Sequence, residues 1–375
     1  MIYLDNAATT KPFNSALEKA KKFNNEEFFN PSALYKGGLS NAKEIKTAKE
    51  NLLRSIGATS DKFEVIFTSC GTESDNQAVF GTIKRGVFVT DLGEHSAIYK
   101  SFLELKNRGI AVYFVGLNKD GSVNQEELYN LVKSTQIDFV SIMHVNNETG
   151  AINDVNTIAK NLKNINPKLI FHSDGVQAFG KIPFRISSYI DLYSISAHKI
   201  NALKGVGALV KRKNLSVKPI IFGGGQENGL RSGTENLFGI KVFEYAFLEH
   251  FENIKVNYDK TLILKNYIID NIDKELFTII SSDNSSPYIL TVSARGIRGE
   301  VLMHSLETEG VIVGNGSACS SKNRFSRVIE ACGYKEDVLD GVVRISFSTE
   351  STLDEIKKAV EILNSTTQKL KRIMR

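Results

Sequence analysis

The stretch 168–199, KLIFHSDGVQAFGKIPFRISSYIDLYSISAHK, holds two short apolar segments, 169–172 and 192–195. Both are nearly continuous in hydrophobicity, which is typical of strands buried on both faces of a parallel sheet. The first runs into the polar residues 173–177 and the second into 196–199. Because ligands bind at the carboxyl ends of the strands in open parallel sheets, this stretch predicts both a sheet and a site at its edge.

Further short segments of the same kind precede this stretch. Runs rich in β-branched and aromatic residues occupy 65–68, 87–90, 111–115 and 139–143, and helix-patterned stretches such as 98–108 and 155–162 lie between such runs. Alternation of this type predicts an α/β fold, with a mainly parallel sheet covered by helices on both faces.

The pattern changes near Asn253. A long helical run is followed by two strand-like segments, 277–280 and 288–292, and then by helix, strand and helix. This order indicates a second, smaller α+β domain. We therefore expect a large domain over 12–252 and a small domain built from 1–11 and 253–375.

Composition excludes several classes of protein. The 375 residues are 42% hydrophobic and 24% charged, and the net charge of +5 comes from interleaved signs, which does not indicate a nucleic-acid partner. No apolar run reaches membrane-spanning length, and the start of the chain lacks the pattern of a signal peptide, so we expect a cytoplasmic protein with no membrane partner. Three cysteines without a CxxC pair favour reduced thiols and no metal.

Chemically distinctive residues follow three of the expected strands. The turn 69–76 opens a helix whose free N–H groups could hold a phosphate, although, taken alone, the turn is better explained as a capped helix without any ligand. Asp174 and Lys199 follow neighbouring strands. A desolvated lysine can form a Schiff base and a carboxylate can keep a pyridinium nitrogen protonated, and pyridoxal phosphate needs both groups. An ordinary solvated lysine remains the alternative for Lys199, and Lys204 is a nearby competitor.

The run 314–322, GNGSACSSK, places Cys319 among glycine and small residues. Such residues neither pack a core nor hold a regular helix, so we expect a mobile loop. A thiol on such a loop is either placed for reaction or merely fills a turn.

Taken together, these segments resemble the cysteine desulfurases of the NifS/IscS type, which are fold-type I pyridoxal-phosphate enzymes of the class V aminotransferase group. The resemblance runs from Tyr3 to beyond Arg344. It rests on the blocks YLDNAATT at 3–10, FTSCGTESDN at 67–76, HVNNETG at 144–150, SAHK at 196–199 with KGVGAL at 204–209, RSGT at 231–234 and GSAC at 316–319.

The resemblance implies a large domain with a mainly parallel seven-stranded sheet, and it assigns roles around pyridoxal 5'-phosphate. Lys199 would form the Schiff base, Asp174 would pair with the pyridine nitrogen and Gln177 would donate to the ring oxygen. His95 would stack on the ring and assist proton transfers. The phosphate would be held by Gly71, Thr72, Ser196 and His198, with Thr234 reaching in from the other subunit of a homodimer.

The resemblance also implies the reaction. Asn147, which would lie beside the cofactor, and Arg344 would orient the carboxylate of L-cysteine. The Cys319 thiolate, activated by a neighbour such as His95, would take the sulfur as a persulfide and release L-alanine. The sulfur would then pass to an acceptor protein, an iron-sulfur scaffold or a tRNA-thiolation enzyme. Cys332, in a helix-like segment, is expected only to pack.

Two alternatives to desulfuration stay open at this point. One is a different enzyme on the same scaffold, a selenocysteine lyase or an aminotransferase, and transamination would need no loop thiol. The other is a non-catalytic binding subunit that retains the fold.

Overall fold

The structure, a computed structural model, describes residues 1–82, 85–315 and 324–373. Its centre is a seven-stranded sheet. In spatial order the strands are β2 (Phe63–Thr68), β8 (Gly207–Arg212), β7 (Leu192–Ser196), β6 (Ile170–Asp174), β5 (Phe139–Ser141), β3 (Val87–Asp91) and β4 (Ala111–Val115). Strand β8 is antiparallel to both of its neighbours, and every other pair in this sheet is parallel.

Alternate residues of the strands enter two separate apolar cores. Phe88, Phe139 and Leu192 pack on one face with helices α4 (Gly71–Thr82) and α5 (Ser96–Asn107). Their neighbours Val89, Val140 and Tyr193 enter the larger core on the other face. This alternation follows from the two-residue period of a strand, and it explains why the sequence of each strand is apolar throughout.

The larger core is covered by six helices, some from before the first strand of the large sheet, some from between its strands and one from after its last strand. They are α1 (Asn14–Ala20), α2 (Lys22–Asn25), α3 (Lys36–Ser55), α6 (Gln125–Ser134), α7 (Val155–Ile165) and α8 (Leu237–Glu252). Two short 3-10 turns, Ala197–Lys199 and Glu227–Gly229, connect the remaining segments of this part.

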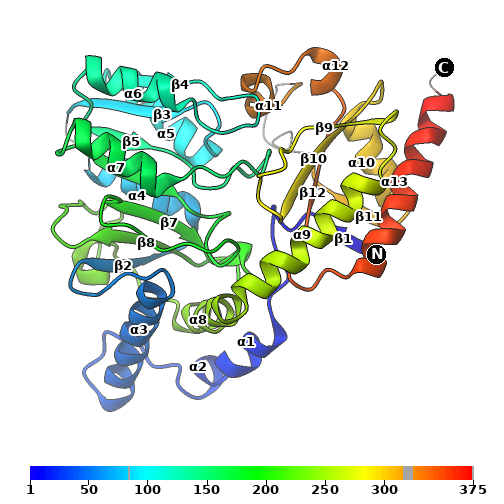
Figure 1. The fold of residues 1–375 in the computed structure, drawn as a ribbon. Coiled ribbons are helices and arrows are strands. Elements are labelled where there is room, and N and C mark those ends of the chain that lie inside the picture. The colour runs from blue at the N-terminus through cyan, green and yellow to red at the C-terminus, as the bar shows by residue number, and fades with distance from the viewer. Residues whose placement is uncertain (83–84, 316–323, 374–375) are drawn as a thin grey trace.

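The C-terminal part has its own sheets and core. Strands β12 (Val342–Ser346), β10 (Ile289–Ala294) and β9 (Phe277–Ile279) form an antiparallel sheet, and β1 (Ile2–Leu4) pairs in parallel with β11 (Val311–Val313). The helices are α9 (Ile254–Asn271), α10 (Gly299–Thr308), α11 (Arg327–Ala331), α12 (Glu336–Leu339) and α13 (Leu353–Ile373). Figure 1 shows the blue strand β1 lying among these yellow-to-red elements, so both ends of the chain build this part.

The predicted α/β fold with a mainly parallel seven-stranded sheet is confirmed. Each strand predicted by residue range has a counterpart in β2 to β7, β9 or β10. Where one strand was expected between the last helices, the structure has two, β11 and β12, and β1 and the antiparallel β8 were not predicted as strands. The boundary near Asn253, which lies between α8 and α9, stays a prediction. Within the ranges 1–82, 85–315 and 324–373, no helix is both long enough and apolar enough to cross a bilayer.

The turn after β6 allows a sensitive test of this packing. A Cβ atom added at Gly175 would overlap the ring of Tyr193, which is fully buried and has no room to move. We expect Gly175→Ala to lower the free energy of unfolding by about 1–3 kcal/mol, measured by chemical denaturation. Gly116→Ala is the control, since its Cβ would meet only the flexible end of Glu127. Equal stability of the two variants would contradict the assigned packing.

Candidate active site

A pocket of about 700 Å³ opens at the carboxyl ends of the central strands. It is lined by predicted residues from both parts of the chain: Gly71, Thr72, His95, Asn147, Asp174, Gln177, Ser196, His198, Lys199 and Arg344. Thr234 is exposed and lies in a separate small cleft beside Phe67 and Ser69. Lys204 is exposed and does not line the large pocket, while Cys319 lies outside the described residues.

Lys199 ends the 3-10 turn that follows β7. Its Nζ atom donates to the carbonyl oxygens of Ala7 and Ala8, each at 2.7 Å. Burial, and then the positive charge of Arg344, lower the pKa of Lys199 to about 8 against the opposing effect of nearby carboxylates. A substantial fraction of this amine is therefore uncharged and nucleophilic near neutral pH.

Two buried carboxyl groups lie together on the floor of the pocket. Asp174, at the end of β6, accepts a hydrogen bond from the Val176 N–H at 2.8 Å, yet burial raises the pKa of Asp174 to about 6. Burial and the nearby Asp174 raise the pKa of Asp75 well above its ordinary value. Ligand atoms of Asp75, Asp174 and His95 lie within 4.8 Å of one another. Such a pair is stabilised by a cation, either a metal ion or a protonated ring nitrogen.

His95 caps the N-terminus of α5. Its Nδ1 atom accepts a hydrogen bond from the Ala97 N–H at 3.2 Å, so the proton of the neutral ring is on Nε2. The His95 side chain is exposed to the open pocket, yet the surrounding protein atoms desolvate it, and this effect, with the charge of Lys199, lowers the pKa of His95 to about 4. In this tautomer Nε2 donates, and it could accept a proton from Cys319 only after the bond to Ala97 broke.

The residues that follow β2 and end β7 form one side of the pocket and could bind an anion. Helix α4 begins at Gly71, and no described residue accepts a hydrogen bond from the N–H groups of Gly71 or Thr72. The Ser196 Oγ atom is buried without a hydrogen-bond partner. A Cβ atom at Gly71 would lie 2.9 Å from Val176 Cγ2, so only glycine fits here. Free donors at a helix N-terminus favour a phosphate group.

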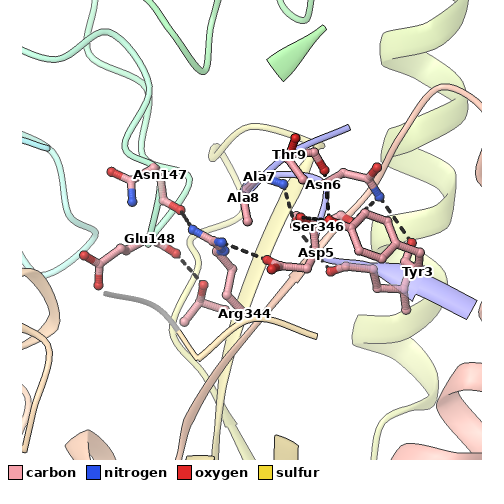
Figure 2. A network of polar contacts seen from close by, with 12 residues as sticks. Tyr3, Asp5, Asn6, Ala7, Ala8, Thr9, Asn147, Glu148, Arg344 and Ser346 are labelled. Atoms are coloured by element: carbon pink, nitrogen blue, oxygen red, sulfur yellow. Dashed lines mark hydrogen bonds and ion pairs between the residues drawn. The ribbon is translucent and has the colours of Figure 1, made fainter. Parts of the chain in front are cut away.

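Arg344, on β12, holds the opposite side of the pocket. Figure 2 shows its guanidinium between two segments: one nitrogen donates to Asp5 Oδ1 and the other to the Asn147 carbonyl oxygen, each at 2.8 Å. The N-terminal segment is fixed further by Ser346, whose Oγ atom accepts from the Ala7 N–H at 2.9 Å. Residues 5–8 therefore place Ala7 and Ala8 against Lys199.

Several pocket residues escaped the sequence analysis, and Arg327 is the clearest case. It lies at the start of α11, its guanidinium stacks 3.8 Å from the Tyr99 ring centroid, and it donates to the carbonyl oxygens of Leu92 and Glu94. No sequence pattern links positions 99 and 327. Asp5 belongs to the family segment 3–10, but its ion pair with Arg344 joins residues far apart in the sequence and could not be predicted from that segment.

An α/β fold that gathers these polar groups in one pocket at the carboxyl ends of its strands is that of an enzyme. The chain belongs to the aminotransferase class-V family, whose model matches residues 2–359. It is 34% identical to a cysteine desulfurase IscS of Dictyoglomus turgidum, over 99% of this chain and 96% of that protein. It is 32% identical to the cysteine desulfurase NifS of Azotobacter vinelandii, over 96% and 90% of the two chains.

A solved structure agrees with these sequence comparisons. A NifS-like protein superimposes with a TM-score of 0.90 and 31% sequence identity, over 99% of each chain. The resemblance to the NifS/IscS type stated from the sequence motifs is confirmed.

The Asp5–Arg344 pair has a measurable effect on stability. Its side chains are 20% and 6% exposed, so removing the carboxylate leaves a largely buried guanidinium without its charged partner. We expect Asp5→Asn to lower the free energy of unfolding by about 1–3 kcal/mol. Glu300→Gln, which removes the exposed pair with Arg298, should change it by less than about 0.5 kcal/mol. Similar effects of the two substitutions in denaturant titrations would contradict this role of Asp5.

Proposed function

We propose that this chain is a cysteine desulfurase: L-cysteine and the Cys319 thiol give L-alanine and a Cys319 persulfide. One observation carries the proposal most directly. Lys199, with its pKa lowered to about 8, lies in one pocket with Asp174 and Arg344. The names of full-length relatives, cysteine desulfurases IscS and NifS, support the same reaction.

The pocket residues fit pyridoxal 5'-phosphate. The unpartnered Ser196 Oγ and the free N–H groups at Gly71 and Thr72 suit a phosphate. The buried carboxyl pair suits a protonated ring nitrogen. A metal ion would also neutralise the charge of the two carboxyl groups. It would not account for the free donors of the anion site or for the lysine with its lowered pKa. We therefore infer a pyridoxal-phosphate site.

Each residue then has a definite part in holding the group. Gly71, Thr72, Ser196 and His198 would hold the phosphate, and Asp174 would hold the ring nitrogen. His95, Asn147 and Gln177 would surround the ring, and Lys199 would attach to the aldehyde carbon. When bound, the cofactor supplies a sink for electrons released at the substrate α carbon.

The protein's own groups perform the remaining work. The guanidinium of Arg344, with Asn147, binds the carboxylate of L-cysteine. Lys199, once uncharged, removes the α proton and can return a proton at the end of the reaction. The carbon–sulfur bond of the substrate breaks as a sulfur–sulfur bond to Cys319 forms. The thiols of L-cysteine and Cys319 together bring two hydrogens to the reaction. One remains on the Cys319 persulfide, and the other completes the methyl group of L-alanine.

Three further parts of the proposal concern the setting of the enzyme. Thr234 does not reach the pocket of its own subunit, which supports a homodimer in which it serves the partner's phosphate. Exposed apolar residues provide area for such an interface, among them Phe28, Leu34 and Phe222, at 69%, 89% and 80% exposure. We place the enzyme in the cytoplasm, where the persulfide would be passed to an iron-sulfur scaffold or a tRNA-thiolation enzyme.

The loop thiol distinguishes this function from the alternatives. We expect Cys319→Ala to reduce formation of L-alanine from L-cysteine by at least about 100-fold, because the substrate sulfur loses its proposed acceptor. Cys70, a free thiol that also lines the pocket, should not replace it, and Cys70→Ala should keep turnover. Cys332→Ala is the control, since that thiol is buried and its pKa is raised to about 12. Alanine should be quantified together with protein-bound persulfide. Full turnover by the Cys319→Ala protein would rule out desulfuration through this residue.

The lowered pKa of Lys199 gives a test by pH. Only an uncharged amine attacks an aldehyde, so the rate of covalent uptake of pyridoxal 5'-phosphate should rise with pH and level off above about 8. An ordinary lysine, with a pKa near 10.4, would still be gaining rate at pH 10. Stopped-flow absorbance checks this, with Lys199→Ala as the unreactive control. A rate that keeps rising to pH 10 would contradict the assigned environment.

A further inference from the structure

Lys181 is a buried lysine behind the pocket wall. Its side chain is 4% exposed, and its Nζ atom donates to Gln177 Oε1 at 2.7 Å. The two residues are four positions apart in the helical turn that follows β6, so they lie on the same face. Gln177 lines the pocket and Lys181 does not. The ammonium group therefore reaches the pocket only through the Gln177 amide.

Two other buried lysines form ion pairs with carboxylates. Lys211 pairs with Glu64, and Lys241 pairs with Glu44 and Glu244. Among residues 1–82, 85–315 and 324–373, Lys181 has no carboxylate within ion-pair distance, and its Nζ atom donates to Gln177 instead. Burial, and then the charges of Lys199 and Arg344, lower the pKa of Lys181 to about 7. An ammonium group is expensive to bury without a carboxylate, and an apolar side chain of similar size would avoid this cost. The hydrogen bond to Gln177 therefore gives a reason for a lysine, and not an apolar residue, at position 181.

The contact fixes which way the Gln177 amide faces. The charged form of Lys181 can only donate and the Ala7 carbonyl can only accept, so the two together direct the amide oxygen toward Lys181 and the nitrogen toward Ala7. The nitrogen then donates to the Ala7 carbonyl oxygen at 2.8 Å. An amide nitrogen carries two hydrogens, so one remains for an acceptor in the pocket. A flipped amide would face nitrogen toward ammonium and oxygen toward carbonyl, both unfavourable.

We propose that Lys181 is a positioning residue that holds the Gln177 amide with its nitrogen toward the pocket, ready to donate to an oxygen of the bound cofactor. This inference rests on the proposed pyridoxal-phosphate site. Lys181 itself touches neither cofactor nor substrate, and it acts through Gln177.

A double-mutant cycle tests the proposal through equilibrium binding of pyridoxal 5'-phosphate to the cofactor-free protein. We expect Lys181→Met to weaken binding by about tenfold, because the Gln177 amide loses its fixed orientation. In a Gln177→Leu background the same substitution should have almost no effect, since no amide remains to orient. The visible absorption band of the bound cofactor should shift in the same direction in both single variants.

Lys265→Met is the matched control. Lys265 is 1% exposed and also forms no ion pair with a carboxylate in the described part of the chain, but it donates to Ser285 and Ser286, away from the pocket. Its replacement should lower thermal stability and leave the band and the affinity unchanged. If Lys181→Met does not fold, Lys181→Gln takes its place, since an amide can accept as well as donate and no longer dictates the orientation of Gln177.

The outcomes separate the two proposals. Equal weakening by Lys181→Met in both backgrounds, or no weakening in either, would overturn the positioning role while leaving the cofactor site intact. Absence of Lys199-dependent binding in the unmodified protein would instead overturn the cofactor site. A band shift in Lys181→Met that persists in the Gln177→Leu background would also count against a role through Gln177.

Discussion

The carbonyl oxygens of Ala7 and Ala8 hold the Lys199 ammonium, and the arrangement of the pocket depends on this contact. These carbonyls belong to an N-terminal segment that is fixed by the C-terminal part, through Arg344 on Asp5 and Ser346 on Ala7 (Figure 2). The segment continues to the large sheet, where Thr10 N–H donates to the His198 carbonyl oxygen. The first ten residues therefore join the two parts of the chain at the point where the proposed catalytic lysine lies.

This join also explains the electrostatics of the pocket. Lys199 and Arg344 come from different parts of the chain, and their proximity lowers the pKa of the lysine beyond the effect of burial. Asp174 and Asp5 act in the opposite direction, one from each part. The pKa of about 8 is the balance of these contributions. A change in how the two parts meet would alter that balance even if no pocket residue were replaced, because Coulomb interactions depend on distance.

The sequence predicted most of the large sheet because its inner strands are buried on both faces and begin with apolar runs. Strand β8 was missed because its glycine and lysine residues break such a run, and β1 because it pairs with β11, more than 300 positions away. Asp174 and Lys199 could be chosen because they directly follow predicted strands. Their residue types and places suggested a Schiff base and a pyridinium partner, and the family motifs then assigned these roles, as they assigned the roles of His95 and Cys319. Lys181 and Arg327 act through contacts with other side chains and backbone groups, and no local pattern marks them.

Several polar groups in this pocket are costly without a ligand. Ser196 Oγ and one oxygen of Asp75 are buried with no hydrogen-bond partner, and Asp75 lies beside a second carboxyl group. Buried polar groups of this kind destabilise the fold unless something pairs with them. A ligand with a phosphate at one end and a protonated ring nitrogen at the other would satisfy these groups together. Its binding free energy would then add to the stability of the fold, because it binds the folded state alone. These buried polar groups without a hydrogen-bond partner in the protein are therefore the groups that the proposed cofactor would bind.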